Sequence, residues 1–137
     1  MSEVSVSQLA YVDASALVKL FIPESESEAV EAVLRADWPA QIASEVLSVE
    51  ISRVALKHSR EASLRAIEIL KPVALMPLTS QIRADAARIH PPILRTLDAI
   101  HLASALSARD QVGAVFTYDT RLADACRDAG LRVLAPA

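Results

Sequence analysis

The chain has 137 residues, of which 53% are hydrophobic, and it carries a formal net charge of −3. This length suits one domain with a single core, and the negative charge means that an activity on nucleic acid would need a local basic patch or bound cations. Because the sequence shows neither an apolar run of membrane-spanning length nor a signal peptide, we expect a cytoplasmic protein. Cys126 is the only cysteine, which excludes an internal disulfide and a thiolate metal cluster.

The first half of the chain alternates short apolar runs with amphipathic segments. Residues 9–12 fit a buried strand and residues 14–21 repeat apolar side chains at helical spacing, so the pattern changes at Asp13. The elements expected next are a helix over 24–36, a weak strand over 39–43, a helix from an N-cap at Ser44 to about residue 58, and a helix over 60–70. The last of these helices carries Leu64, Ile67 and Leu70 on one face.

The second half continues the alternation. Its expected elements are a strand over 73–77, a helix capped by Thr79 and Ser80, a helix over 96–109, a strand over 114–117, a helix over 120–129 and a strand over 131–134. Gly130 is expected just after the last helix, and we interpret Cys126 as a small buried hydrophobe and not a nucleophile. Strands that alternate with helices predict one α/β domain over residues 1–137, with a parallel sheet covered on both faces.

Four carboxylates stand out by their position in these patterns. Asp13 and Asp119 each follow an apolar strand and precede a helix, and ligands bind at the carboxyl ends of strands in open α/β sheets. Glu50 and Asp98 fall on apolar helix stripes, where an unpaired charge is costly. Simpler interpretations stay open: Asp13 and Asp98 as helix N-caps, and Glu50 as a solvated acid paired with Arg53.

The four acids together indicate a metal site, because clustered carboxylates repel one another unless cations neutralise them. An oxygen-only set of ligands suits Mg²⁺, with Mn²⁺ as a possible substitute. The histidines, His58, His90 and His101, are too scattered for a zinc motif. His101 shares a helix face with Asp98, so it either supports the metal site or is a partly buried histidine of the core.

Motifs around these acids follow the order of those in a known family. They are YVDASALVK at residues 11–19, SEVLSVE at 44–50 with Arg53 beyond it, LDAIHLA at 97–103 and TYDTRL at 117–122. On these motifs the sequence resembles the PIN-domain ribonucleases, and most closely the VapC toxins of type II toxin-antitoxin pairs. The resemblance covers nearly the whole chain, and it selects Glu50 over Glu45 as the acid of the second motif.

The resemblance implies a three-layer α/β/α fold, whose parallel five-stranded sheet has the order 3-2-1-4-5, and a metal-dependent endoribonuclease acting on single-stranded or loop RNA. In such an enzyme Asp13, Glu50, Asp98 and Asp119 would be the catalytic and metal-binding residues, supported by Ser15 and Thr117. Attack by a metal-activated water would leave a 5′-phosphate and a 3′-hydroxyl. The resemblance also implies a VapB-like antitoxin as partner and a homodimer.

Basic side chains near the motifs are candidates for RNA binding. Arg53 and Lys57 follow Glu50 on one expected helix, and Arg95 and Arg121 lie beside the later motifs, although ordinary solvated helix faces explain them equally well. We interpret Lys19 as a solvated lysine, and the acidic residues at 24, 26 and 28 as charge that suits the start of a helix.

Two other classes of protein are alternatives. A receiver-like phosphoacceptor domain also gathers acids at strand ends, but it would need an acid pair after the first strand, where Asp13 stands alone, and an Asp at the end of the third, which ends at Met76 and Pro77. A PIN-like module that binds without cutting would not need all four acids.

Overall fold

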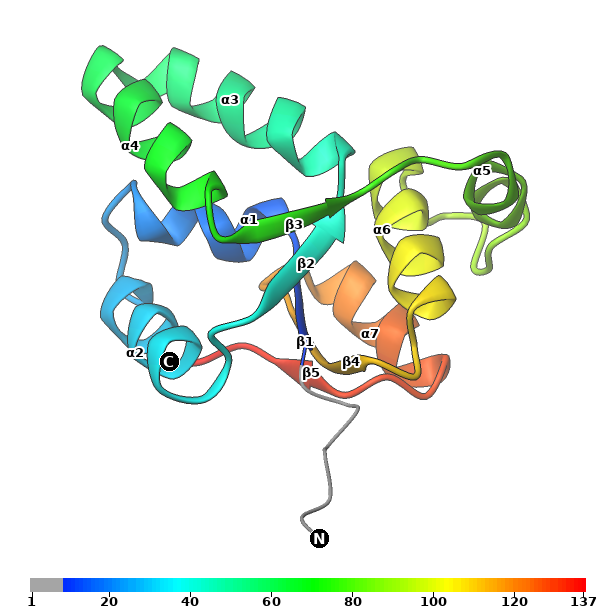
Figure 1. Ribbon diagram of the computed structural model, residues 1–137. Coiled ribbons are helices and arrows are strands. Elements are labelled where there is room, and N and C mark those ends of the chain that lie inside the picture. Colours follow the sequence, from blue (N-terminus) through cyan, green and yellow to red (C-terminus); the bar gives the residue numbers. More distant parts are fainter. Residues whose placement is uncertain (1–8) are drawn as a thin grey trace, which may run out of the picture.

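A computed structural model describes residues 9–137, and its centre is a five-stranded sheet (Figure 1). The strands are β1 (Leu9–Val12), β2 (Gln41–Ser44), β3 (Val73–Met76), β4 (Val112–Phe116) and β5 (Val133–Leu134). All of them are parallel, in the order β3-β2-β1-β4-β5. The predicted parallel sheet and strand order are therefore confirmed; the first eight residues of the predicted domain lie outside the described part of the chain.

Helices cover the sheet on both faces. They are α1 (Ala14–Leu17), α2 (Ser27–Asp37), α3 (Val46–His58), α4 (Arg60–Leu70), α5 (Ser80–Ala87), α6 (Thr96–Ser107) and α7 (Thr120–Asp128). The connections from β1 to β3 run one way across the sheet and those from β3 to β5 run back, so right-handed crossovers place α1–α4 and α5–α7 on opposite faces. Figure 1 shows the α3–α4 hairpin on one side and α6 with α7 on the other. No helix within residues 9–137 has the length and apolar character needed to cross a membrane.

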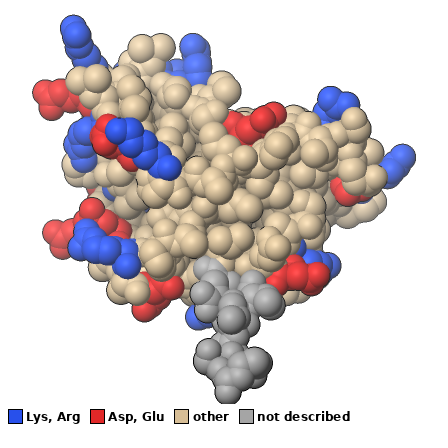
Figure 2. Space-filling model, viewed as in Figure 1, with Lys and Arg blue, Asp and Glu red and all other residues tan. Residues whose placement is uncertain are grey.

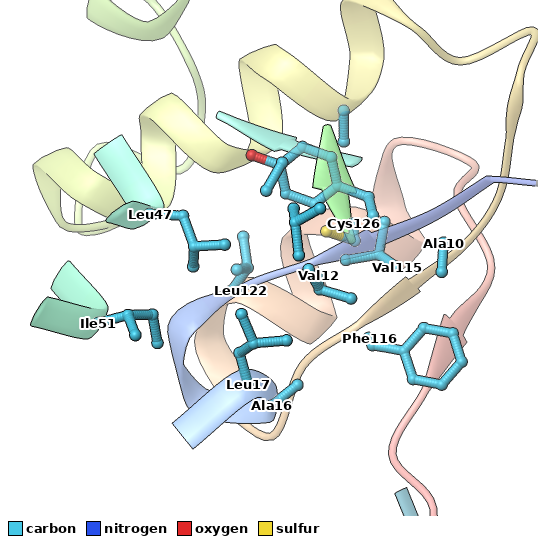
Figure 3. Close-up of a cluster of buried hydrophobic side chains, with 14 of the residues drawn as sticks. Ala10, Val12, Ala16, Leu17, Leu47, Ile51, Val115, Phe116, Leu122 and Cys126 are labelled. Carbon is cyan, nitrogen blue, oxygen red and sulfur yellow. The ribbon is translucent and has the colours of Figure 1, made fainter. Parts of the chain in front are cut away.

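The hydrophobic core surrounds β1, the central strand. Ala10, Tyr11 and Val12 are fully buried because helices cover both faces of this strand. Figure 3 shows side chains from β1, β4 and several helices meeting there, among them Leu17, Leu47, Ile51, Phe116 and Leu122. Cys126 lies in the same cluster, and burial raises the pKa of its thiol to about 12. Its interpretation as a small buried hydrophobe fits this environment.

Helix α4 has the predicted limits, but most of its predicted apolar face is exposed. Leu64 and Ile67 are 59% and 57% exposed, whereas Ala62 and Ala66 on the opposite face are only 2% exposed. Leu70 alone of the expected set packs against the core. Because α3 also presents a fully buried alanine, Ala55, small side chains let the helices of the hairpin approach closely.

Lys19 and the acids before α2 also differ from the prediction. The Lys19 side chain is only 10% exposed, and its ammonium lies 3.1 Å from Glu24 and 2.8 Å from Glu26. The same ammonium sits 4.5 Å from the centre of the Tyr118 ring, a cation–π contact. Helix α2 begins only at Ser27, since the two acids are drawn to Lys19 instead of serving the first turn of a helix.

Two helix starts differ in detail. The segment after Asp13 forms α1 and then a 3₁₀ helix, η1 (Val18–Leu20), in place of one continuous helix. Ser44 ends β2, and the N-cap of α3 is Glu45, so the cap was predicted one residue early. Ser44 Oγ nevertheless accepts a hydrogen bond from Val46 N at 3.3 Å, as a capping side chain does. Gly130 has a φ of 89° just beyond α7, as its predicted role requires.

Candidate active site

The candidate site lies where β1 and β4 end side by side. These strands are parallel neighbours, with Val12 opposite Phe116, so the residues that follow them, Asp13 and Thr117, emerge at the same edge of the sheet. Asp13 is 4% exposed and Thr117 is 1% exposed. The alternation of strands with helices thus brings Asp13 and Thr117, which are more than a hundred positions apart in the sequence, into direct contact.

Asp13 is held by donors from three directions. Its Oδ1 accepts hydrogen bonds from Ser15 Oγ at 2.8 Å and from Ala16 N at 3.0 Å, and its Oδ2 accepts one from Thr117 Oγ1 at 2.6 Å and shares the Ser15 hydroxyl at 3.0 Å. The bond from Ala16 makes Asp13 the N-cap of α1, so the simpler interpretation is correct as far as it goes. Burial raises the pKa of the Asp13 carboxyl above its ordinary value, while the bonds from Thr117 and Ser15 oppose the rise.

The two hydroxyls join Asp13 to the turn that carries Asp119. Ser15 Oγ accepts a hydrogen bond from Tyr118 N at 2.8 Å, and Thr117 Oγ1 accepts one from Asp119 N at 3.1 Å. Each hydroxyl therefore donates to the carboxylate and accepts from the β4–α7 backbone. The supporting role in a metal site that the resemblance assigns to Ser15 and Thr117 stays a prediction, and these bonds are compatible with it.

Asp119 and Asp98 lie at the starts of helices. Asp119 is the N-cap of α7, where its Oδ1 accepts bonds from Arg121 N at 2.9 Å and Leu122 N at 3.2 Å. Asp98 belongs to the first turn of α6, whose N-cap position is Arg95, so its interpretation as an N-cap is wrong. Burial raises the pKa of Asp98, and repulsion from the carboxylates of Asp119, Asp13 and Glu50 adds to the rise. The other three acids therefore lie close enough to Asp98 to act on it electrostatically.

Glu50 pairs with His101 and not with Arg53. His101 Nε2 lies 2.6 Å from Glu50 Oε1, and His101 Nδ1 lies 2.7 Å from the hydroxyl of Tyr11. His101 is 2% exposed, whereas the Glu50 side chain is 18% exposed and reaches the surface. The sequence had left open whether His101 supports the site or belongs to the core: it is a buried core residue bonded to Glu50, and its support of a metal site stays a prediction. Tyr11 was missed, because nothing in a strand residue signals a partner on a distant helix.

The donor chemistry of this edge suits a hard divalent cation held partly by water. No three Asp, Glu, His or Cys side chains within residues 9–137 are grouped closely enough to enclose a metal ion by themselves. Within the same residues, both oxygens of Asp98, Oε2 of Glu50 and Oδ2 of Asp119 accept no hydrogen bond from protein. The two oxygens of Asp13 each have two such contacts, so the other three acids offer the less occupied oxygens. Mg²⁺ fits such a set, since it retains several waters beside one or two carboxylates.

The four basic candidates surround this edge but do not enter it. Arg53 and Lys57 are exposed on α3 beyond Glu50, Arg95 directly precedes α6, and Arg121 is in the first turn of α7. None of them takes part in an ion pair among the described residues. Figure 2 shows acidic surface between the α3–α4 hairpin and α6, with Lys and Arg spread around the periphery. The positive charges of the four basic candidates are therefore available to bind an anionic ligand.

Comparisons with known proteins agree with this geometry. The family model described as "PIN domain" matches residues 10–128. Ribonuclease VapC46 of Mycobacterium tuberculosis is 36% identical over 126 residues, which cover 92% of this chain and 96% of that protein. A toxin-antitoxin complex from Klebsiella pneumoniae superposes with a TM-score of 0.71 at 22% identity, over 93% of this chain and 98% of that one. VapC20 of M. tuberculosis, described as a sarcin-ricin loop cleaving toxin, superposes with a TM-score of 0.69 at 15% identity, over 89% and 95% of the two chains.

Proposed function

Because the chain belongs to the PIN-domain family, and is similar over most of its length to VapC ribonucleases, we propose that it is an Mg²⁺-dependent endoribonuclease and the toxin of a type II toxin-antitoxin pair. The observation that carries the proposal is the convergence of acids around Asp98, whose pKa is raised by burial and by the charges of Asp119, Asp13 and Glu50, a repulsion that a divalent cation would relieve. The matched family gives the receiver-like alternative no support.

Asp98 is the principal proposed ligand, because both of its oxygens are unpaired within residues 9–137 and the neighbouring acids help to raise its pKa. Glu50 Oε2, Asp119 Oδ2 and the carboxylate of Asp13 complete the set, directly or through water. When bound, Mg²⁺ or Mn²⁺ would supply a water of lowered pKa and positive charge beside the scissile phosphate.

The proposed substrate is RNA, cut by attack of water at phosphorus. Arg95 and Arg121 flank the acids at two helix starts, and Arg53 and Lys57 extend the positive charge along α3, so all four are proposed phosphate contacts. A water nucleophile does not use the 2′-hydroxyl, and the expected products carry a 5′-phosphate and a 3′-hydroxyl. Since such a substrate is cytoplasmic, we place the protein there.

An antitoxin is the proposed protein partner. The solved toxin-antitoxin complex shares this fold, and the α3–α4 hairpin exposes apolar side chains that a protein partner would cover: Val49, Leu56, Leu64 and Ile67. Exposed apolar surface of this kind marks interaction sites in soluble proteins. A homodimer, as the family resemblance implies, is a further part of this proposal.

The test is cleavage of a mixed RNA pool by purified protein, first stripped of metal with a chelator and then supplied with Mg²⁺ or Mn²⁺. Asp98→Asn should lower the cleavage rate by at least about 100-fold, because several kcal/mol of transition-state stabilisation depend on the metal. Asp124→Asn is the matched control, since Asp124 is exposed on α7 and pairs only with Arg127 at 3.5 Å. Cleavage that survives the chelator, or an Asp98→Asn variant as active as Asp124→Asn, would refute the proposal; no cleavage by any form would favour a binding module.

A further inference from the structure

A chain of hydrogen bonds links the backbone of β2 to Glu50 on α3. Ser44 N donates to the hydroxyl of Tyr11 at 3.0 Å, this hydroxyl lies 2.7 Å from His101 Nδ1, and His101 Nε2 lies 2.6 Å from Glu50 Oε1. The four residues belong to β2, β1, α6 and α3. These bonds thus connect β2, β1 and α6 in series to the carboxylate of Glu50.

The interior of this chain is shielded from water. Tyr11 and Ser44 are fully buried, and His101 is nearly so. The rings of Tyr11 and His101 meet edge to face, with centroids 5.7 Å apart and planes at 76°. Polar groups that are buried in this way are stable only when they are hydrogen-bonded, so the packing and the bonds together fix the orientation of the imidazole.

Counting donors fixes the proton that faces Glu50. A backbone amide can only donate, so the Tyr11 oxygen accepts from Ser44 N and has its own proton left to donate. A carboxylate can only accept, so His101 Nε2 carries the proton that faces Glu50. The other ring nitrogen, Nδ1, faces the Tyr11 hydroxyl.

We propose that Tyr11 and His101 are positioning residues, which commit Glu50 Oε1 to a hydrogen bond and leave Oε2 as the oxygen directed to a divalent cation. This inference rests on the proposed function for the presence of that cation. Glu50 lies on a helix surface, where an unsupported side chain would sample several rotamers. Holding one oxygen removes this freedom before the cation arrives, as the partners of metal ligands do elsewhere.

The proton on Nε2 can be observed on the metal-free wild-type protein. Correlation of ring protons with both ring nitrogens by NMR should show a proton on His101 Nε2. The exposed His58 and His90 serve as internal references, since no side-chain hydrogen bond within residues 9–137 fixes their tautomers. Tyr11→Phe should change the chemical shift of Nδ1, which faces the Tyr11 hydroxyl. A His101 ring with its proton on Nδ1 alone would overturn the assignment whatever the protein cleaves.

Substitution of His101 tests the consequence for metal binding. Glutamine can place an amide nitrogen near the position of Nε2, whereas asparagine reaches only the position of Nδ1. Titration calorimetry with Mg²⁺, and again with Mn²⁺, should therefore show a loss of affinity of about 10- to 100-fold for His101→Asn and a loss of only a few-fold for His101→Gln. His90→Asn, at an exposed histidine, should match the wild type, and the melting temperature of each variant shows whether it is folded.

The outcomes separate this inference from the proposed function. A wild-type protein that binds no Mg²⁺ would overturn both. Tight binding by the wild type together with equal affinities for His101→Asn and His101→Gln would overturn the positioning role alone. Rescue by glutamine but not by asparagine would support it, because a purely structural role in the core gives no reason for the longer amide to succeed.

Discussion

Thr117→Val removes a hydroxyl that serves both Asp13 and the turn after β4. The hydroxyl donates to Asp13 Oδ2 at 2.6 Å and accepts from Asp119 N at 3.1 Å, in a residue that is 1% exposed. Valine keeps the branched shape of the side chain, so no large cavity opens and the loss is that of the hydrogen bonds.

The size of the effect follows from the charge on Asp13. A hydrogen bond to a charged group contributes about 1.5–3 kcal/mol, compared with about 1 kcal/mol between neutral groups. We therefore expect Thr117→Val to lower the free energy of unfolding of the metal-free protein by about 2 kcal/mol near neutral pH. For a chain of this size that loss corresponds to a drop in melting temperature of roughly 8 °C.

The loss should depend on pH in a defined direction. The folded pKa of Asp13 is raised above its unfolded value, and Thr117 is the first of the groups that oppose the rise, so valine should raise this pKa further. A folded state that holds its proton more tightly gains stability relative to the wild type as the pH falls. Urea denaturation should thus show the difference between the proteins shrinking to about 1 kcal/mol once Asp13 is protonated in both.

Thr117→Ser is the control, because it keeps the hydroxyl and loses only a buried methyl, about 0.8 kcal/mol at any pH. If Thr117→Val costs no more than Thr117→Ser, or if its cost does not change between neutral and acidic pH, then Thr117 does not stabilise an ionised Asp13 and the reasoning is refuted.

Three further predictions concern other parts of the chain. Asp98→Asn should stabilise the metal-free protein near neutral pH by on the order of 1 kcal/mol. The reason is that the Asp98 carboxyl has a raised folded pKa, so ionising it makes the folded protein less stable as the pH rises through that value. A melting temperature of the variant below that of the wild type would contradict this prediction. Ala66→Leu should lower the free energy of unfolding by about 1–3 kcal/mol by overpacking the α3–α4 contact, whereas Leu64→Ala should change it by less than about 1 kcal/mol. If urea denaturation gave the reverse ranking, Leu64 and not Ala66 would be on the buried face of α4. Cys126 should react with a thiol reagent no faster than the protein unfolds, since its thiol is buried and its pKa is raised to about 12; rapid labelling of the folded protein would count against this.

The sequence is informative about the site wherever the signal is local. An acid at the junction of a strand and a helix, as at Asp13 and Asp119, is visible in a few residues, and parallel topology then places such junctions at one edge of the sheet. Acids on apolar stripes, as at Glu50 and Asp98, are visible for a similar reason. The roles of these residues in metal binding and cleavage stay predictions.

Pairings between distant elements could not be read in this way. The bonds of His101 join residues that are 90 and 51 positions away, to Tyr11 and Glu50 respectively. Lys19 looked solvated because its ion pairs depend on how the chain turns before α2. On α4 both faces carry apolar residues, and only the close approach of α3 decides that alanines face inward.

The pairing of β1 with β4 also bears on how the protein is made. Asp13, which directly follows β1, leaves the ribosome about a hundred residues before its partner Thr117 and the turn with Asp119. Since domains fold largely as units and long-range strand pairs close late, the candidate centre cannot exist on a nascent chain before residues 112–119 have emerged. A nuclease built on this plan would be inert towards the message and the ribosome that are producing it until synthesis of those residues is finished.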